Sequence, residues 1–354
     1  MAGPLRGAAR RPVTPGERPR ADRPAPDAGA PERGAPGGLA RVGAAVARLA
    51  GLLARRALLL AVLLALVFGA VELLPGDAAD ATAERGESAA DIEARRHLLG
   101  LDRPVLERFA DWMAALPSGD LGTSARGESV AALLGTPFPN TLLLGGLALL
   151  VTVAVSLALG CWAALRPGGG VDRAVSASAT AVLAVPEFVV AVALVLVFSQ
   201  WAGWLPAVTI ADATGTPASW DMLVLPVFAL AIPQIGWNTR IVRAALADEA
   251  TAPHVETAVI DGLPRHRVLS HHLLPGALPA IAAGLATSTG MLLGGAVVVE
   301  TIFNYPGVGS VLAGAVTDRD GPLIAGVVAL TGAVISGVLL LADLVRARAS
   351  GRRE

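Results

Sequence analysis

The chain has 354 residues, of which 54% are hydrophobic and 16% are charged, and its formal net charge is −1. A soluble domain carries about 25% charged residues, so this composition excludes a soluble enzyme and predicts an integral membrane protein. The single cysteine, Cys161, lies within an apolar run and excludes a disulfide framework inside the chain.

The basic residues are all arginine, 28 in number, and the sequence contains no lysine. The phosphate-binding loop of P-loop ATPases needs a lysine on the β- and γ-phosphates. The chain therefore cannot contain this loop. If transport is driven by ATP, another subunit binds the nucleotide.

The first 138 residues combine a polar tail, an apolar run and a polar insertion. Residues 1–40 are rich in arginine and proline and cannot bury a core, so we predict a disordered tail. Residues 41–76 hold a lead-in and an apolar run from about 57 to 74, which predicts the first transmembrane helix. Residues 77–138 are polar and mixed, and we expect them to form an insertion between the first two transmembrane helices.

Five more apolar runs follow within residues 139–348, which we take as the core, and residues 349–354 form a short tail. These runs lie at about 141–165, 174–200, 222–246, 280–299 and 323–344. Each approaches or exceeds the roughly 18 apolar residues of a spanning helix. The predicted fold is therefore an all-α membrane protein with six transmembrane helices. Pro186 in the third run, and Pro226 and Pro233 in the fourth, each invite a kink.

A long polar segment, residues 247–279, separates the fourth run from the fifth. Thr251 can cap a short helix there, Pro253 is tolerated in its first turn, and Gly262 can end it in a left-handed conformation.

The predicted short helix has a small apolar face, because Val255, Ala258 and Val259 are spaced at i, i+3 and i+4. A short helix with a compact apolar face, held between two membrane spans, suits docking into a groove of a partner protein. The alternative is an ordinary helix–turn–helix connection.

Polar residues within the predicted spans are candidates for a translocation path. Glu187 is ionisable at membrane depth, which favours a functional role. It could contact a cationic group of a substrate or act as a structural acid, and the sequence favours neither. Gln234 and Asn238 share a helix face, where interhelical hydrogen bonding is the favoured interpretation. His271 and His272 have no carboxylate or cysteine at ligand spacing, so we predict no metal site.

Arginine distribution predicts the orientation of the chain. Residues 1–56 contain 11 arginines and 4 acidic residues, whereas residues 77–128 contain 6 arginines and 11 acidic residues. Since arginine excess marks the cytoplasmic side, we expect both termini and residues 247–279 in the cytoplasm. Residues 77–138 then lie on the external, periplasmic side.

The polar segment also carries a recognisable pattern. Glu256-Thr257-Ala258, then Gly262, His272 and Leu274-Pro275, resembles the cytoplasmic coupling motif of bacterial ABC importer permeases. Thr257 replaces the first alanine of that motif. Ile260-Asp261 replaces an Ala-Lys pair of the peptide-importer branch, which reverses one charge.

Three other stretches resemble the peptide/nickel branch of these permeases. They are Leu-Gly-Leu-Asp-Arg-Pro at 99–104, Ser-Gly-Asp-Leu-Gly-Thr-Ser at 118–124 and Glu-Thr-Ile-Phe-Asn-Tyr-Pro-Gly-Val-Gly at 300–309. Over residues 48–348 the chain is thus similar to the permease subunit of a peptide/nickel-type bacterial ABC importer. This is the family of binding-protein-dependent transport inner-membrane components.

The resemblance implies the six-helix type I importer fold, embedded in the lipid bilayer of the cell membrane. It implies a second homologous permease, two ABC ATPase subunits and an extracytoplasmic solute-binding protein as partners, and no nucleic acid. ATP would be bound by the partners, with no cofactor, metal or catalytic residue on this chain. The substrate would be a di- or oligopeptide or a nickel-type solute, moved by alternating access.

The resemblance assigns roles to three groups of residues. The coupling contacts to the ATPase would be Val255, Glu256, Ala258, Val259, Gly262, Arg265 and His272. A translocation path would include Glu187, Gln234 and Asn238. An external signature would comprise Glu300, Phe303, Pro306, Gly307 and Gly309.

Two other functions are compatible with a helical membrane protein. An ion-gradient-driven secondary transporter would use intramembrane acids such as Glu187, but the inverted repeats that favour this class are not apparent in the sequence. A membrane assembly or scaffold protein without a transport role is the other alternative. Co-purification with a P-loop ATPase would separate the importer from both.

Overall fold

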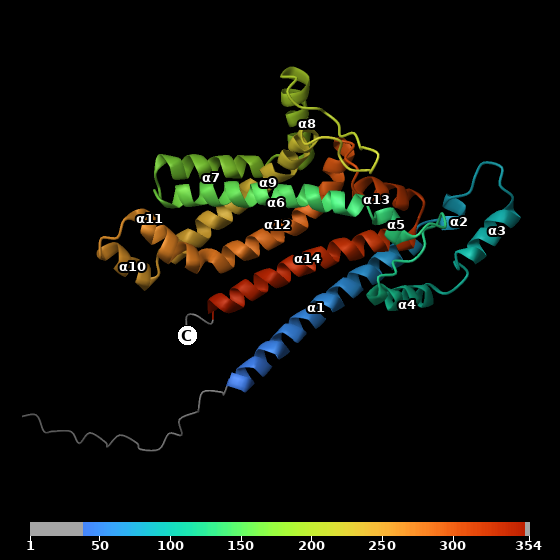
Figure 1. Cartoon of the computed structure of the whole chain (residues 1–354), viewed down its shortest axis with the longest axis horizontal. Helices are drawn as coiled ribbons and strands as arrows, with labels where there is room; N and C mark the ends of the chain where they lie inside the picture. The colour runs from blue at the N-terminus through green and yellow to red at the C-terminus, as the bar shows by residue number, and fades with distance from the viewer. Residues whose placement is uncertain (1–37, 351–354) are drawn as a thin grey trace, which may run out of the picture. The chain divides into compact units, whose positions relative to one another are not determined.

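The computed structural model describes residues 38–350, and their regular secondary structure is helical (Figure 1). Residues 1–37 of the predicted tail, and residues 351–354 of the predicted C-terminal tail, lie outside the described residues. The chain divides into two units, residues 1–49 and 50–354, and the second unit contains the bundle of long helices.

Within residues 38–350, five helices are long and apolar enough to cross a membrane. They are α1 (Gly38–Glu72), α6 (Pro137–Ala164), α9 (Asp221–Glu249), α12 (Leu274–Ile302) and α14 (Gly321–Ser350). They confirm the predicted first, second, fourth, fifth and sixth spans. Pro226 and Pro233 lie inside α9, which continues through both of them.

The third span is broken, so the prediction of one helix over about 174–200 was wrong. Helix α7 (Gly170–Leu183) ends before Pro186. After it, α8 (Glu187–Leu194) continues as the π-helical turn η2 (Val195–Trp201). The axis of α7 and the axis of α8 with η2 differ by a bend of 100°. Proline lacks the N–H that would continue the helix and disfavours a helical conformation of the residue before it. The described part of the chain therefore has five spans, or six if this bent pair crosses the membrane as one span.

Helix α9 is the central element of the core and packs against α6, α7, α8 and α12. The largest cluster of buried side chains joins it to α6 and α12 and includes the fully buried Leu144, Leu230 and Leu292. Small residues allow the close approach: a Cβ atom at Gly284 would lie 2.8 Å from Ile241 Cδ1 of α9.

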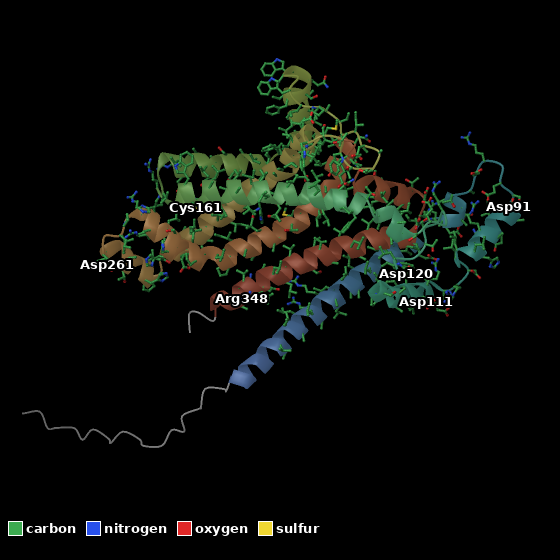
Figure 2. The ribbon with its side chains drawn as sticks, in the orientation of Figure 1. Asp91, Asp111, Asp120, Cys161, Asp261 and Arg348 are labelled. Atoms are coloured by element: carbon green, nitrogen blue, oxygen red, sulfur yellow. The ribbon has the colours of Figure 1, made fainter. Side chains whose placement is uncertain are left out.

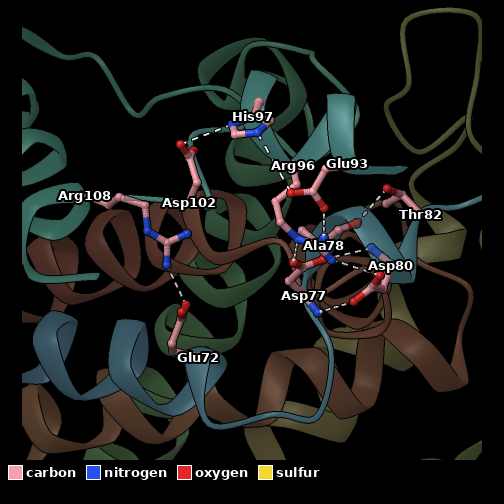
Figure 3. Close-up of polar contacts among 10 residues, drawn as sticks. All are labelled: Glu72, Asp77, Ala78, Asp80, Thr82, Glu93, Arg96, His97, Asp102 and Arg108. Carbon is pink, nitrogen blue, oxygen red and sulfur yellow. Dashed lines mark hydrogen bonds and ion pairs between the residues drawn. The ribbon is translucent and has the colours of Figure 1, made fainter. Parts of the chain in front are cut away.

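The insertion contains α2 (Ala78–Ala81), α3 (Ala89–Leu98), α4 (Val105–Ala115), the 3₁₀ turn η1 (Leu116–Ser118) and α5 (Val130–Leu134). Capping boxes begin α2 and α3, formed by Asp77 with Asp80 and by Ser88 with Asp91. Figure 3 shows Arg96 of α3 bound to Asp77 and Asp80, which joins α3 to α2. Trp112 of α4 packs on Phe68 of α1, with ring centroids 6.3 Å apart.

The remaining short elements lie at the ends of the long helices. The connection between α9 and α12 holds α10 (Pro253–Ile260), α11 (Arg265–Arg267) and the π-helical turn η3 (Val268–Leu273). Helix α13 (Val308–Thr317) lies at the other end of α12 (Figure 1). In Figure 2, Asp261 marks the end at α10, and Asp91, Asp111 and Asp120 mark the insertion at the opposite end.

Candidate functional site

The boundaries of α10 follow from its proline and its glycine. Pro253 occupies the first turn, but Thr251 is not the cap: the N-cap is Ala252, and the Thr251 hydroxyl donates to the carbonyl of Asp248 at 2.8 Å. The prediction for Thr251 was wrong because α9 extends to Glu249, so that Thr251 bonds back to its last turn.

The end of α10 agrees with the prediction for Gly262, whose φ is +74°. The amide of Gly262 donates to the carbonyl of Val259 at 3.1 Å, and the amide of Leu263 donates to that of Ala258 at 3.2 Å. This pair of bonds defines a Schellman motif, which glycine forms without steric cost.

One part of the apolar face of α10 is buried against the rest of the chain, and the other part is exposed to solvent. Val255 and Ala258 are each 3% exposed and pack against Val268 of η3. Val259 and Ile260 are 60% and 76% exposed. The prediction of one docking face was therefore wrong for Val255 and Ala258, which attach α10 to the rest of the chain and leave Val259 accessible.

Further contacts fix α10 to the long helices. His254 Nε2 lies 3.6 Å from Glu249 Oε1 at the end of α9, and its ring centroid is 6.2 Å from that of His272 in η3. The Arg265 guanidinium donates to the carbonyl of Leu165, just after α6, at 3.4 Å. Of the remaining predicted coupling residues, Glu256 is exposed to solvent. The segment is thus attached to α9 through His254 and to the end of α6 through Arg265 of α11, and η3 leads directly into α12.

Glu187 lies at the bend of the third span, as the first residue of α8. Its side chain is partly buried, and its carboxylate contacts Gly295 of α12 so closely that a Cβ atom there would collide with it. Within residues 38–350, its Oε1 is buried without a hydrogen-bond partner. The bend therefore places an unsatisfied acid between α8 and α12.

Gln234 and Asn238 are buried on α9. The Asn238 side-chain amide donates to the Ser288 hydroxyl of α12 at 2.6 Å and to the carbonyl of Gln234 at 2.9 Å. This contact supports the interhelical hydrogen-bond interpretation for Asn238. No hydrogen bond among the described residues joins Gln234 or Asn238 to Glu187.

The signature segment, residues 300–309, forms a buried polar cluster. Glu300 is 1% exposed and accepts hydrogen bonds from the Thr141 hydroxyl at 2.5 Å and from the Gly309 amide at 2.6 Å. The Thr141 hydroxyl accepts in turn from the Val308 amide at 2.9 Å. Gly307 has no room for a side chain, because a Cβ atom would overlap the Glu300 carboxylate.

A second layer of bonds extends this cluster. The Tyr305 hydroxyl donates to the Asn140 carbonyl at 2.8 Å, and the Asn140 side chain donates to the carbonyls of Pro306 and Gly215 at 2.7 and 2.9 Å. Burial, and then the charge of Glu300, raise the pKa of Tyr305. The Phe303 side chain is buried, and its carbonyl accepts from the Thr209 amide at 2.7 Å.

All five predicted signature residues therefore meet in one cluster, which ties α6, α12, α13 and the loop after η2 together. Sequence reasoning missed Asn140, Thr141 and Tyr305 as members. Their polarity beside apolar runs was the available signal, but only the fold shows that Thr141 bonds to Glu300 and that Asn140 bonds to Tyr305 and Pro306.

Sequence reasoning also missed two buried acids that join separate segments by hydrogen bonds. Asp320 is 2% exposed and accepts from the amides of Ala125 in the insertion, at 2.7 Å, and of Leu323 in α14, at 3.0 Å. Burial raises the pKa of Asp320. Asp172 of α7 pairs with Arg243 of α9, whose Nη2 lies 2.8 Å from Oδ2.

Comparisons with known proteins agree with this geometry. Residues 156–353 match the family model described as the binding-protein-dependent transport system inner membrane component. A peptide transport system permease protein of Brucella abortus (strain 2308) is 32% identical over 282 residues, covering 79% of this chain and 90% of that relative. The glutathione transport system permease protein GsiC of Pectobacterium atrosepticum is 33% identical over 289 residues, covering 81% and 92%.

Among solved structures, an inward-facing conformation of the MetNI methionine ABC transporter is similar over 61% of this chain and 95% of that chain. Its sequence identity is 18% and the TM-score is 0.49. The match to the family model and the relatives at 32% and 33% identity decide the classification. The chain belongs to the family of binding-protein-dependent transport system inner membrane components, the permease subunits of peptide-type ABC importers.

Proposed function

We propose that this chain is one permease half of an ABC importer and that separate ATPase subunits drive it through α10. The observation that carries this proposal is the exposed apolar pair Val259 and Ile260 on a helix that packs on η3 and contacts the end of α9. The absence of lysine supports it, because the chain cannot form the nucleotide loop of an ATPase.

The proposed mechanism is alternating access. Closure of two ATPase subunits on ATP displaces α10, and its attachments at Val268, Glu249 and Arg265 carry the displacement to α12, α9 and the end of α6. A partner can shift the permease between two states only if it interacts differently with each of them. Gly262 and the Schellman motif keep α10 at a fixed angle to η3, which makes it suitable as a lever.

The substrate path belongs to the same proposal. We place it beside Glu187, at the break of the third span, since an unsatisfied acid at membrane depth favours a cavity or a partner. The peptide and glutathione named for the relatives favour a short peptide as the substrate.

Orientation and partners complete the proposal. Arginine excess places both termini and residues 247–279 in the cytoplasm and residues 77–138 outside. The proposed division is a tail (1–40), a first helix (41–76), an insertion (77–138), a core (139–348) and a C-terminal tail (349–354). The partners are a second permease, two ATPase subunits and an external solute-binding protein.

Co-purification and transport test the proposal. The full chain, isolated from its native membrane in mild detergent, should carry a P-loop ATPase with it, and the reconstituted complex should accumulate a peptide only with ATP. Uptake that persists without ATP, or an active complex without a nucleotide-binding subunit, would contradict it. For orientation, Arg85→Cys in the insertion should react with a membrane-impermeant maleimide in intact cells, and Thr257→Cys in α10 only after permeabilisation.

A further inference from the structure

A pocket of about 540 Å³ lies between the end of α1, the insertion and the turn before α14. Its size is within the range of small-molecule sites. Apolar walls come from Phe68, Val71 and Trp112. Gly127 also lines it and has nothing within 4 Å of where its Cβ atom would be, so its main chain is open to a ligand's own peptide groups.

The carboxylates that line this pocket are already paired. Glu72 accepts from Arg108 at 2.5 Å, as Figure 3 shows, and Asp111 accepts from Arg103 at 2.6 Å. Asp77, which also lines the pocket, is bound by Arg96 at 2.5 Å, and Asp320 is held by main-chain amides. These acids are therefore not available to bind a cation directly.

Arg319 differs from these acids in its lack of a bonding partner among the described residues. It lines the pocket and is partly buried, and its guanidinium makes no hydrogen bond or ion pair within the described stretch of the chain. Its backbone is left-handed, with a φ of +52°, a conformation that a non-glycine residue seldom adopts. Its Nη1 lies beside Gly76, 3.5 Å from where a Cβ atom of that residue would be. Arg108, on another wall, has a buried Nε without a partner among the described residues.

We propose that this pocket binds the terminal carboxylate of a short peptide through Arg319. A partly buried guanidinium without a partner calls for an anionic group with two oxygens, which a carboxylate supplies in matching geometry. The apolar walls receive the peptide's side chains, and the open main chain at Gly127 meets its amide groups. An anionic lipid headgroup would supply the same kind of anion, and the lipid arm of the test below distinguishes the two ligands.

This proposal rests on the proposed import of peptides and assigns them an additional site, in the insertion. The site is built from other elements than those around Glu187, which lies between α8 and α12. It would hold a peptide before the peptide enters the path between the spans.

Equilibrium binding to the purified full chain in phosphatidylcholine nanodiscs tests the proposal. The probes are trialanine and trileucine, each as the free acid and as the C-terminal amide. The variant is Arg319→Asn, because asparagine tolerates the left-handed backbone. The matched control is Arg85→Asn, which removes an exposed arginine of the insertion that does not line the pocket.

We expect one of the free acids to bind at least about tenfold more tightly than its amide, and Arg319→Asn to remove that difference. Arg85→Asn should leave the affinities unchanged. Equal affinities for acid and amide, no binding of either acid, or binding unaltered by Arg319→Asn would overturn the proposal. So would loss of the acid–amide difference in the wild type when phosphatidylglycerol is added to the disc, because an anionic lipid would then be the ligand of Arg319.

Uptake by the reconstituted complex separates the two proposals. If the wild type imports the peptides with ATP but Arg319→Asn binds them as the wild type does, the pocket assignment is wrong and the importer function stands. If the complex imports no peptide under any condition, the proposed function itself fails.

Discussion

Glu300 is the residue on which the contacts between helix ends converge. It is an acid at the end of α12, yet it is 1% exposed and bound by one hydroxyl and one main-chain amide. An acid that is this well satisfied has little free capacity to bind a solute. We therefore assign the signature cluster to holding α6, α12 and α13 together.

The first prediction concerns Glu300→Gln. The substitution replaces one acceptor oxygen by a donor, so either the Thr141 hydroxyl or the Gly309 amide loses its partner. An unsatisfied buried group costs about 1–3 kcal/mol, and thermal unfolding in detergent should occur at a lower temperature. Glu107→Gln, at an exposed site on α4, should change stability by less than about 0.5 kcal/mol. Identical melting of the two variants would show that the cluster does not stabilise the fold.

Glu187 contrasts with Glu300, because one of its oxygens is buried and has no partner in the described residues. The second prediction is that Glu187→Gln weakens uptake of peptides with a free amino group. A charge-assisted bond to an ammonium group is stronger than a neutral one, so the apparent KM should rise by at least about tenfold.

N-acetylated peptides should be transported equally by the wild type and Glu187→Gln, and Glu107→Gln again serves as the control. An unchanged KM for every peptide with a free amino group would leave Glu187 with a structural role only.

At the scale of elements, α10 and its terminal glycine are the parts that the proposal requires to be rigid. The third prediction is that Gly262→Val leaves the protein in the membrane but uncouples ATP hydrolysis from uptake. Nothing lies within 4 Å of a Cβ atom at Gly262, so the effect arises from the left-handed backbone, which costs a β-branched residue roughly 1–2 kcal/mol.

Gly86→Val is the matched control, because Gly86 also has a positive φ, +93°, and open space around it, but lies in the insertion. The reconstituted complex with Gly86→Val should retain coupled uptake. If Gly262→Val also transports as the wild type does, α10 is not the lever.

The elements also show how far the sequence could predict the fold. Apolar runs of sufficient length located five spans, because burial in a bilayer requires such runs. They could not locate the 100° bend at Pro186, since Pro226 and Pro233 lie inside a helix that continues. Whether a proline breaks or only interrupts a helix depends on the neighbours that satisfy the freed groups, and a single sequence does not give these.

For the candidate site, motif spacing located the left-handed Gly262, because its backbone requirement is local. The role of the signature residues stays a prediction. Motif spacing could not show that Val255 and Ala258 face inward, since a helix of eight residues can turn either edge of its apolar face toward its own chain. The partners of Glu300, and the lack of a partner for the Arg319 guanidinium among residues 38–350, also depend on contacts between segments far apart in the sequence.

For the whole molecule, the central claim is that a separate ATPase binds at α10 and powers this chain. Family membership makes the chain an importer permease. In the proposed mechanism, the contacts of α10 with η3 and α9 are the route by which movement would reach the long helices. The claim therefore depends on what contacts the exposed edge of α10.

Cross-linking from that edge tests the claim most directly. In a Cys161→Ala background, Val259→Cys on the exposed edge and Val255→Cys on the buried edge are each treated with a short thiol-to-amine cross-linker in native membranes. The account predicts that Val259→Cys becomes linked to a nucleotide-binding subunit and that Val255→Cys does not. An actively transporting complex in which Val259→Cys is linked to no such subunit would contradict it.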